Sequence, residues 1–208
     1  MVFMNIGIDM DGVLFDTESE FRALAFLFNT CKFNGKIIDP ETIRNQYRFD
    51  WSQEQFEEFM GKTLIPIHST APVMPFAKKV IQLLKENGHK IYSITARGSR
   101  YKEEINVTER RLKEENITFD KILYVKTSEK LQACQELNID IMIDDLYETI
   151  DLLSDNNIDC LYYRDVVLKF IDKPNVREVR NWGEVYTELV KRNILPLVDI
   201  DEFIEYLK

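Results

Sequence analysis

The sequence predicts an α/β fold built on a mostly parallel, five-stranded sheet with helices on both faces. Short apolar runs without polar alternation recur along the chain, and stretches of helical periodicity separate them. Strands buried on both faces read as continuous apolar runs, and parallel neighbours need a crossover connection, usually a helix. A third observation sets the size: 208 residues, 45% of them hydrophobic, suffice for one core and a smaller subdomain.

The apolar run before Asp9 predicts the first strand, and a helical insertion follows it. From about residue 17 to 73 the chain lacks strand alternation, and apolar residues at helical spacing mark two helical regions: Phe21, Leu24, Ala25 and Phe28, then Trp51, Phe56, Phe59 and Met60. Three prolines between residues 66 and 75 argue against continuous helix there. We therefore expect a core domain of residues 1–16 and 74–208, and a helical cap subdomain of residues 17–73.

From Pro75 onward, helices and strands alternate regularly. Pro75 suits the first turn of a helix and Gly88 suits the position just after its end, with an apolar face between them. The elements expected next are a strand at 89–95, a helix at 99–115, a strand at 121–125, a helix at 128–137, a strand at 139–143, a helix at 146–153 and a strand at 160–163. One or two further helices are expected between 182 and 208.

Composition excludes several classes of function. A net charge of −9 argues against a nucleic-acid polymer as partner, because phosphate-tracking surfaces need clustered Lys and Arg. The cysteines, Cys31, Cys134 and Cys160, are odd in number and lie among apolar neighbours, which is typical of reduced core residues. With no basic leader and no window of about 18 apolar residues, we expect a cytoplasmic protein that does not span a membrane. The sequence leaves open whether it is a monomer or a homodimer.

Two carboxylates, Asp9 and Asp11, stand at the expected end of the first strand. Alternate residues of an extended chain point to the same side, so both would emerge together, and Gly12 lets the chain turn just beyond. The carboxyl edge of an open α/β sheet is where ligands bind. Two adjacent carboxylates raise each other's pKa unless a cation lies between them. The pair therefore predicts a magnesium site, although helix capping would explain either residue alone.

Polar residues at three further positions are expected at the same edge. Thr95 ends the second strand before a helix, an arrangement that suits phosphate as well as simple capping. Asp144 and Asp145 follow the apolar run Ile-Met-Ile and again favour a cation, with N-capping of the next helix as the alternative. Lys130 lies at the start of the helix before that strand, and only this position distinguishes it from an ordinary surface lysine.

Together these residues resemble the four motifs of the haloacid dehalogenase-like (HAD) superfamily of phosphatases. The first motif corresponds to residues 9–13, Asp-Met-Asp-Gly-Val; the second to Thr95; the third to Lys130, with Lys126 as the competing candidate; and the fourth to Asp144 and Asp145. The resemblance covers the chain from Ile6 to about Asp145. It implies a Rossmann-like parallel sheet carrying a helical cap inserted after the first strand.

The resemblance also implies a mechanism. Asp9 would attack phosphorus and form an aspartyl-phosphate, and Asp11 would protonate the leaving group and later deprotonate water. Mg²⁺ would bind Asp9, Asp144 and the backbone carbonyl of Asp11, with Asp145 as a direct or water-mediated ligand. Phosphate binding is expected from Thr95, Ala96, Arg97 and Lys130. Arg97 would grip a phosphate, pair with an acid of the insertion, or form a surface salt bridge. Neither His68 nor His89 is expected to take part.

The substrate is expected to be a small phosphorylated metabolite. The sequences Ile-Thr-Ala-Arg and Ile-Asp-Asp resemble those of the 5′(3′)-deoxyribonucleotidase branch and its bacterial relatives. This resemblance favours a nucleoside monophosphate as the substrate. Residues 11–18, Asp-Gly-Val-Leu-Phe-Asp-Thr-Glu, also resemble the sugar-phosphate branch, which includes phosphoglycolate phosphatases and phosphomutases. A non-catalytic module that binds magnesium and phosphate is the third alternative. The insertion also contains four aromatic residues that would either stack on a nucleobase or form the core of the insertion: Phe21, Phe28, Phe49 and Trp51. The core is the favoured alternative.

Overall fold

The computed structural model describes residues 3–42, 44–164 and 170–207. Its described part contains a parallel sheet of six strands in the order β3-β2-β1-β4-β5-β6. The strands are β1 (Asn5–Ile8), β2 (Lys90–Thr95), β3 (Lys121–Tyr124), β4 (Ile141–Asp144), β5 (Asp159–Tyr163) and β6 (Val176–Val179). The predicted α/β class with a parallel sheet is confirmed.

The predicted number of five strands was one too low, because β6 was missed. The sequence of β6 is Val-Arg-Glu-Val, whose two central residues are polar, so it lacks the continuous apolar run used to find the other strands. It is an edge strand, and among the described residues its one partner strand is β5. Such a strand is covered less completely than the central ones, and its sequence carries a weaker signal.

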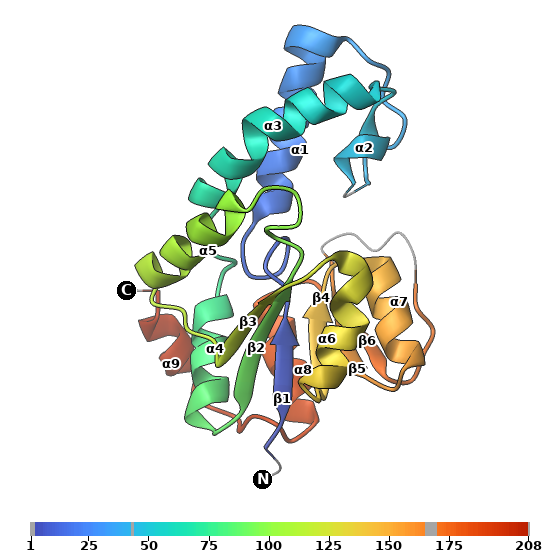
Figure 1. The fold of residues 1–208 in the computed structure, drawn as a ribbon. Helices are drawn as coiled ribbons and strands as arrows, with labels where there is room; N and C mark the ends of the chain where they lie inside the picture. Colours follow the sequence, from blue (N-terminus) through green and yellow to red (C-terminus); the bar gives the residue numbers. More distant parts are fainter. Residues whose placement is uncertain (1–2, 43, 165–169, 208) are drawn as a thin grey trace.

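Helices cover both faces of the sheet (Figure 1). Ile6 and Ile8 of β1 share a buried cluster with α4 (Ala77–Glu86) and α8 (Trp182–Lys191). Met142 and Cys160 share a second cluster with α6 (Lys130–Glu136) and α7 (Tyr147–Asp155). Successive side chains of a strand point to opposite faces, so these two clusters are the two sides of one sheet.

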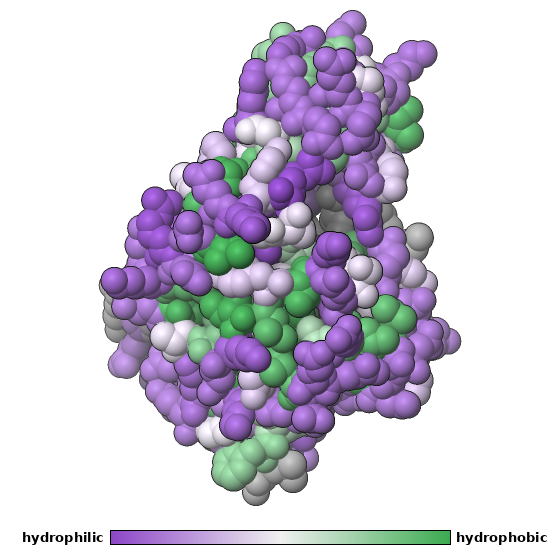
Figure 2. Space-filling model, in the orientation of Figure 1, coloured by the Kyte–Doolittle hydropathy of each residue, from purple (hydrophilic) through white to green (hydrophobic). Residues whose placement is uncertain are grey.

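The insertion forms α1 (Thr17–Phe28), a π-helical turn (Asn29–Phe33), α2 (Asn45–Arg48) and α3 (Gln53–Thr70). We refer to these helices together as the cap. The cap projects beyond the carboxyl ends of the strands, and α3 packs against both α1 and α5 (Glu103–Glu114) (Figure 1). In the space-filling view the outer surface of the cap is mostly hydrophilic, whereas hydrophobic residues gather on the core below it (Figure 2).

The expectation that Pro66 would interrupt the helix was wrong, since α3 continues through it to Thr70. A proline inside a helix removes one backbone hydrogen bond. Burial on both sides of Pro66 offsets that loss, because Leu64, Ile67 and His68 are all buried. Ser52 also begins the helix with a capping box that includes Gln55.

Several element boundaries also differ from the predictions. The helix expected from residue 99 begins only at Glu103, and the one expected from 128 begins at Lys130 after a 3₁₀ turn (Thr127–Glu129). Cys134 and Cys160 are buried, but Cys31 is exposed because its π-helical turn buries no residue. Among the described helices, none is long and apolar enough to cross a membrane.

The carboxyl-terminal region supplies α8 and α9 (Ile200–Glu205), whose place the sequence did not reveal. The buried indole of Trp182 donates a hydrogen bond to the backbone oxygen of Val13, at 2.8 Å. At the opposite end of the sheet, a ring nitrogen of His89 lies 2.9 Å from the backbone oxygen of Ile194. The tail is thus attached near both ends of the sheet, and Trp182 supports the turn that follows Asp9 and Asp11.

Candidate active site

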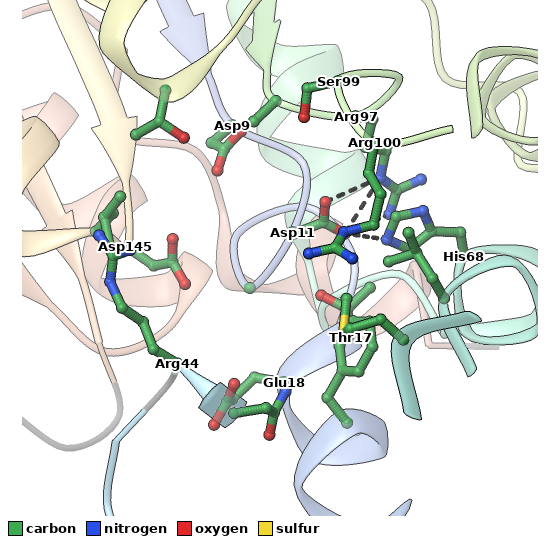
Figure 3. Close-up of a pocket in the computed structure, with 18 of the residues that line it drawn as sticks. Asp9, Asp11, Thr17, Glu18, Arg44, His68, Arg97, Ser99, Arg100 and Asp145 are labelled. Carbon is green, nitrogen blue, oxygen red and sulfur yellow. Dashed lines mark hydrogen bonds and ion pairs between the residues drawn. The ribbon is translucent and has the colours of Figure 1, made fainter. Parts of the chain in front are cut away.

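The first group of site residues lies where β1 and β4 end side by side. Asp9 follows β1 and extends its pairing with β4, its backbone N–H donating to Ile143 O at 3.0 Å. Asp144 is the last residue of β4 and Asp145 follows it. One carboxylate oxygen from each of Asp9, Asp144 and Asp145 lies within 4.8 Å of the others. The structure therefore brings together acids from two segments that are far apart in the sequence (Figure 3).

Lys130, the first residue of α6, lies among these carboxylates. Its Nζ is 3.1 Å from Asp9 Oδ1 and 2.6 Å from Asp144 Oδ2. The other oxygen of Asp144 accepts a hydrogen bond from the backbone N–H of Leu146, at 2.9 Å. Lys126, the competing candidate from the sequence, is exposed and lies outside the described lining of the adjacent cavity. Of the two lysines, it is Lys130 that contacts the acids.

Three carboxylates and one ammonium leave this group with excess negative charge. Burial, reinforced by Asp144 and Asp11, raises the pKa of Asp9 to about 7 against the opposing effect of Lys130. Burial and the charges of Asp144 and Asp9 also raise the pKa of Asp145 well above its usual value. Burial opposes the charge of Lys130, but Asp144 and Asp9 outweigh that effect and raise its pKa. A divalent cation would relieve this excess, and all-oxygen donors fit Mg²⁺.

Asp11 lies in different surroundings, although it is only two residues from Asp9. Arg97 holds it through Nη2 at 2.6 Å from Oδ1, and through Nε at 3.1 Å from both oxygens. Arg97 is itself buried, bonds Thr108 Oγ1 through Nη1 at 3.1 Å, and lies over the ring of Phe15. Burial would raise the pKa of Asp11, but Arg97 and His68 outweigh it and hold that pKa well below its usual range.

Of the interpretations of Arg97 drawn from the sequence, contact with a phosphate stays a prediction. The other two, a pair with an acid of the insertion and a surface salt bridge, were wrong. The guanidinium instead forms a buried ion pair with Asp11, which belongs to the core. Sequence spacing could not reveal this pair, because 86 residues separate the two partners and only the adjacency of β1 and β2 brings them together.

Thr95 is fully buried at the end of β2, and its hydroxyl accepts the backbone N–H of Arg97 at 3.3 Å. It is absent from the described lining of the cavity, whereas the next residue, Ala96, is part of it. No helix starts directly after Thr95, since α5 begins at Glu103. The expected cradle of threonine hydroxyl and helix N-terminus is therefore replaced by a loop, with Thr95 bonded inside it.

Gly12 shows why the turn after Asp11 requires glycine. Its φ is +73°, a conformation that other residues adopt only with strain. A Cβ atom at this position would lie less than 2.5 Å from Asp145 Oδ2. The first motif and the fourth thus meet at Gly12, with backbone and carboxylate packed closely together.

Known proteins resemble this chain in sequence and in fold. No family model matches the chain. Among curated proteins, "Putative nucleotidase YqfW" of Bacillus subtilis is 25% identical over 87% of this chain and 91% of its own length. A Bacillus cereus protein of the same description is 26% identical over 92% of this chain and 100% of its own length.

Solved structures share the fold. A HAD family hydrolase from Deinococcus radiodurans, with bound phosphate and sodium, gives a TM-score of 0.63 at 13% identity, covering 94% of this chain and 99% of that one. A β-phosphoglucomutase from Clostridium difficile gives a TM-score of 0.57 at 18% identity and covers 99% of both chains.

The chain shares its fold with HAD family hydrolases of known structure and is similar in sequence to proteins described as putative nucleotidases. These similarities agree with the expected resemblance to the HAD superfamily of phosphatases, and the expected fold is confirmed. The cap and the core line an open cavity of about 340 Å³. Asp9, Asp11, Lys130 and Asp145 lie on the core side. On the cap side, α1 and α3 contribute an apolar part of the lining: Phe21, Phe56, Met60 and Leu64. A polar part of the lining comes from Arg44, Asn45 and Gln46.

The aromatic residues of the cap mostly form its own core, the alternative favoured from the sequence. Phe49 and Trp51 stack on each other at 4.8 Å, and Phe28 packs edge-on against Phe59. Phe28, Phe49 and Trp51 are absent from the described lining of the cavity, whereas Phe21 is present. Of the four aromatic residues considered for base stacking, only Phe21 is in position to meet a ligand there.

Two buried residues near Asp11 were not predicted from the sequence: His68 faces Asp11, and Glu104 faces His68. His68, on α3, has its Nε2 3.5 Å from Asp11 Oδ1 (Figure 3). Glu104, on α5, has its Oε2 3.7 Å from His68 Nδ1. Both side chains are buried and both residues line the cavity. The available signal was a histidine on an apolar helix face, four residues after Leu64. That pattern is more often found in a protein core, and it carried no information about Asp11.

Proposed function

We propose that this protein is a magnesium-dependent phosphomonoesterase that hydrolyses nucleoside 5′-monophosphates through an aspartyl-phosphate on Asp9. The observation that carries the proposal is the convergence of Asp9, Asp144 and Asp145 beside Lys130. The side chains of Asp9, Asp144 and Asp145 and the backbone carbonyl of Asp11 are the groups that would hold Mg²⁺. When bound, the ion would neutralise the acids and polarise a phosphoryl oxygen.

The chain's own residues account for the two chemical steps. A carboxylate oxygen of Asp9 attacks phosphorus while the ester bond to the leaving oxygen breaks, and Asp11 gives that oxygen a proton. Water then attacks phosphorus of the aspartyl-phosphate, Asp11 takes its proton, and phosphate leaves as the Asp9 carboxylate is restored. The ammonium of Lys130 is in position to hold a phosphoryl oxygen beside Asp9.

Asp11 must be protonated before it can act as an acid, yet Arg97 favours its ionised form. A phosphate dianion entering the cavity changes that balance, because a neighbouring negative charge raises the pKa of a carboxyl group. Substrate binding thus prepares the acid, while in the free protein Asp11 remains paired with Arg97.

The substrate class is supported by the relatives and by the cavity. The curated relatives described as nucleotidases align over most of this chain. The cavity is of a size that small-molecule sites commonly have. At one end it is lined by charged residues, including Asp9, Asp11 and Lys130. Elsewhere it has an apolar wall with Phe21 and Phe56, and Asn45 and Gln46 also line it. An aromatic wall with amide groups suits a nucleobase, which has a flat face and a hydrogen-bonding edge.

The test is a panel of phosphate esters assayed for phosphate release with Mg²⁺ and with excess EDTA. Deoxynucleoside and ribonucleoside 5′-monophosphates are compared with glucose 6-phosphate and phosphoglycolate. We expect the nucleotides to give the highest kcat/KM, and EDTA to abolish release. Preference for a sugar phosphate or phosphoglycolate would overturn the nucleotide assignment. Magnesium-dependent phosphate binding without turnover of any ester would indicate a non-catalytic module.

A pair of variants controls for contaminating phosphatases. Asp9→Asn should lose activity, whereas Asp140→Asn should retain it. Asp140 lies at the amino-terminal end of β4, where its side chain accepts the backbone N–H of Asn5 at 2.7 Å. It therefore offers the same substitution at the opposite end of the sheet from the site.

A further inference from the structure

His68 lies between two carboxylates at the junction of cap and core. Its side chain is only 3% exposed, with Nε2 3.5 Å from Asp11 Oδ1 and Nδ1 3.7 Å from Glu104 Oε2. Nδ1 is buried and has no hydrogen-bond partner among the described residues. Figure 3 shows the ring of His68 approaching Asp11 from the side that also bears Arg97.

Packing alone does not explain a histidine at this position. The ring packs edge-on against Phe21 at 6.3 Å, a contact that an apolar side chain would make equally well. Leaving a buried polar atom without a partner destabilises a protein, because the atom loses its hydrogen bonds to water and gains none in return. Packing in the core of the cap therefore does not account for the two ring nitrogens, of which Nε2 faces Asp11 and Nδ1 faces Glu104.

Asp11 is contacted by one side chain from the core and by one from the cap. The core side chain is Arg97, which contacts both carboxylate oxygens and is fixed by Thr108 on α5. The cap side chain is His68, which approaches the same oxygen, Oδ1, that Arg97 Nη2 contacts. A general acid must direct one oxygen toward the leaving group, so its partners decide whether it is productive.

The face of α3 that carries His68 also lines the cavity. Met60, Leu64 and His68 follow one another at intervals of four residues, so they lie on one side of the helix, and all three line the cavity. The surface that would meet the leaving group is therefore continuous with the contact to Asp11. A ligand that packs against Met60 and Leu64 lies one to two helical turns from His68.

We propose that His68 is a positioning residue through which the cap orients Asp11 for proton transfer to the leaving group. The inference rests on the proposed phosphatase function and assigns one of its steps to a residue of α3. His68 makes this contribution without touching phosphorus, because its described polar neighbours are Asp11 and Glu104. The consequence is selective: only substrates whose leaving group needs a proton depend on His68.

Two substrates with different leaving groups separate this role from a structural one. Thymidine 5′-monophosphate releases an alkoxide that needs a proton, whereas p-nitrophenyl phosphate releases a stable phenolate that does not. With Mg²⁺ present, His68→Phe should lower kcat for the nucleotide about tenfold or more, with KM nearly unchanged. The kcat for p-nitrophenyl phosphate should stay within about threefold of wild type. His68→Gln, which keeps a hydrogen-bonding group, should recover most of the loss.

Thr63→Val is the matched control on α3. Thr63 is buried, its hydroxyl donates to the backbone oxygen of Phe59, and it lies outside the described cavity lining. This variant should leave the ratio of the two kcat values unchanged. His68→Leu is measured in parallel, so that the result does not depend on one substitution folding well.

Three outcomes would overturn the proposal. Equal losses for both substrates would assign His68 to folding, and an unchanged kcat for the nucleotide would show that Asp11 does not need it. Either result leaves the phosphatase function intact if wild type hydrolyses both esters. Wild type that hydrolyses neither ester with Mg²⁺ would overturn the proposed function together with this inference.

Discussion

Asp9 and Asp11 are two residues apart in the chain, yet their surroundings shift the pKa values of their carboxyl groups in opposite directions. On the side of the site formed by β1, β4 and α6, Asp9 shares one lysine with two other acids, and its pKa rises to about 7. On the side formed by the β2–α5 loop and α3, Asp11 has Arg97 to itself, and its pKa falls.

The difference shows that the two carboxyl groups of one short motif lie in surroundings of different charge. The Asp9 side has fewer positive than negative charges, and for this reason we propose that it binds a cation. The Asp11 side has a cationic partner within the chain, Arg97. The two sides meet at Gly12, where the backbone passes against Asp145. Substitutions on the two sides should have different consequences.

The largest expected effect is the loss of the nucleophile. Asp9→Asn should lower kcat for the preferred nucleotide by about 10⁴-fold or more, because the amide cannot form the covalent intermediate. Steady-state phosphate release measures this effect, with Asp140→Asn as the control. Activity within about tenfold of wild type would exclude Asp9 as the nucleophile.

A smaller loss is expected from Asp11→Asn, which removes proton transfer but leaves the metal ligands and Lys130 in place. The kcat for a nucleotide should fall by about 10²–10⁴-fold. Magnesium-dependent phosphate binding, measured by calorimetry, should remain close to that of wild type. Unchanged hydrolysis would contradict the assigned role of Asp11, and lost phosphate binding would show that its side chain is needed to form the metal side.

The raised pKa of Asp9 predicts a pH-dependent stability difference between wild type and Asp9→Asn. Without metal, unfolding lets Asp9 ionise at its ordinary pKa of 3.8, whereas in the folded protein its pKa is about 7. The folded state of wild type should therefore lose stability relative to the variant as pH rises from about 4 to about 7. Denaturant unfolding in EDTA measures this difference, and saturating Mg²⁺ should remove or reverse it. A pH-independent difference would contradict the account.

The smallest effect expected is on stability at the Asp11 side. Asp11→Asn leaves the guanidinium of Arg97 buried without its partner, and should destabilise the fold by about 2 kcal/mol, since Asp11 is itself partly exposed to solvent. Asp9→Asn should instead stabilise the metal-free protein near pH 7. Denaturation midpoints of the two variants, compared in EDTA, should move in opposite directions. Equal shifts of the same sign would remove the contrast between the two sides.

The sequence was informative where local pattern determines structure. Strand ends that carry Asp9 and Asp144 are visible as apolar runs followed by acids, and the regular alternation of helices and strands then places those ends at one edge. The same reasoning missed β6, because its central residues are polar and it lies at the edge of the sheet. Pro66 was misinterpreted because burial of its neighbours outweighs one missing hydrogen bond.

Sequence patterns could not predict which side chains contact Asp11. Arg97 and His68 are 86 and 57 positions from Asp11, and each sits in a segment with an ordinary local explanation. Their meeting depends on how α3 packs against α5 and on which way a guanidinium turns. Tertiary packing decides both, and neither has a counterpart in periodicity or composition.

The most direct test of the central claim is the covalent state of Asp9 during turnover. Wild type mixed with its preferred substrate and Mg²⁺ is quenched in acid within the first turnover, and the protein is examined by mass spectrometry. The account predicts the added mass of one phosphoryl group on the peptide that contains Asp9, absent from Asp9→Asn and from samples in EDTA. Rapid phosphate release without any phosphorylated protein, or a phosphoryl group on another residue, would contradict it.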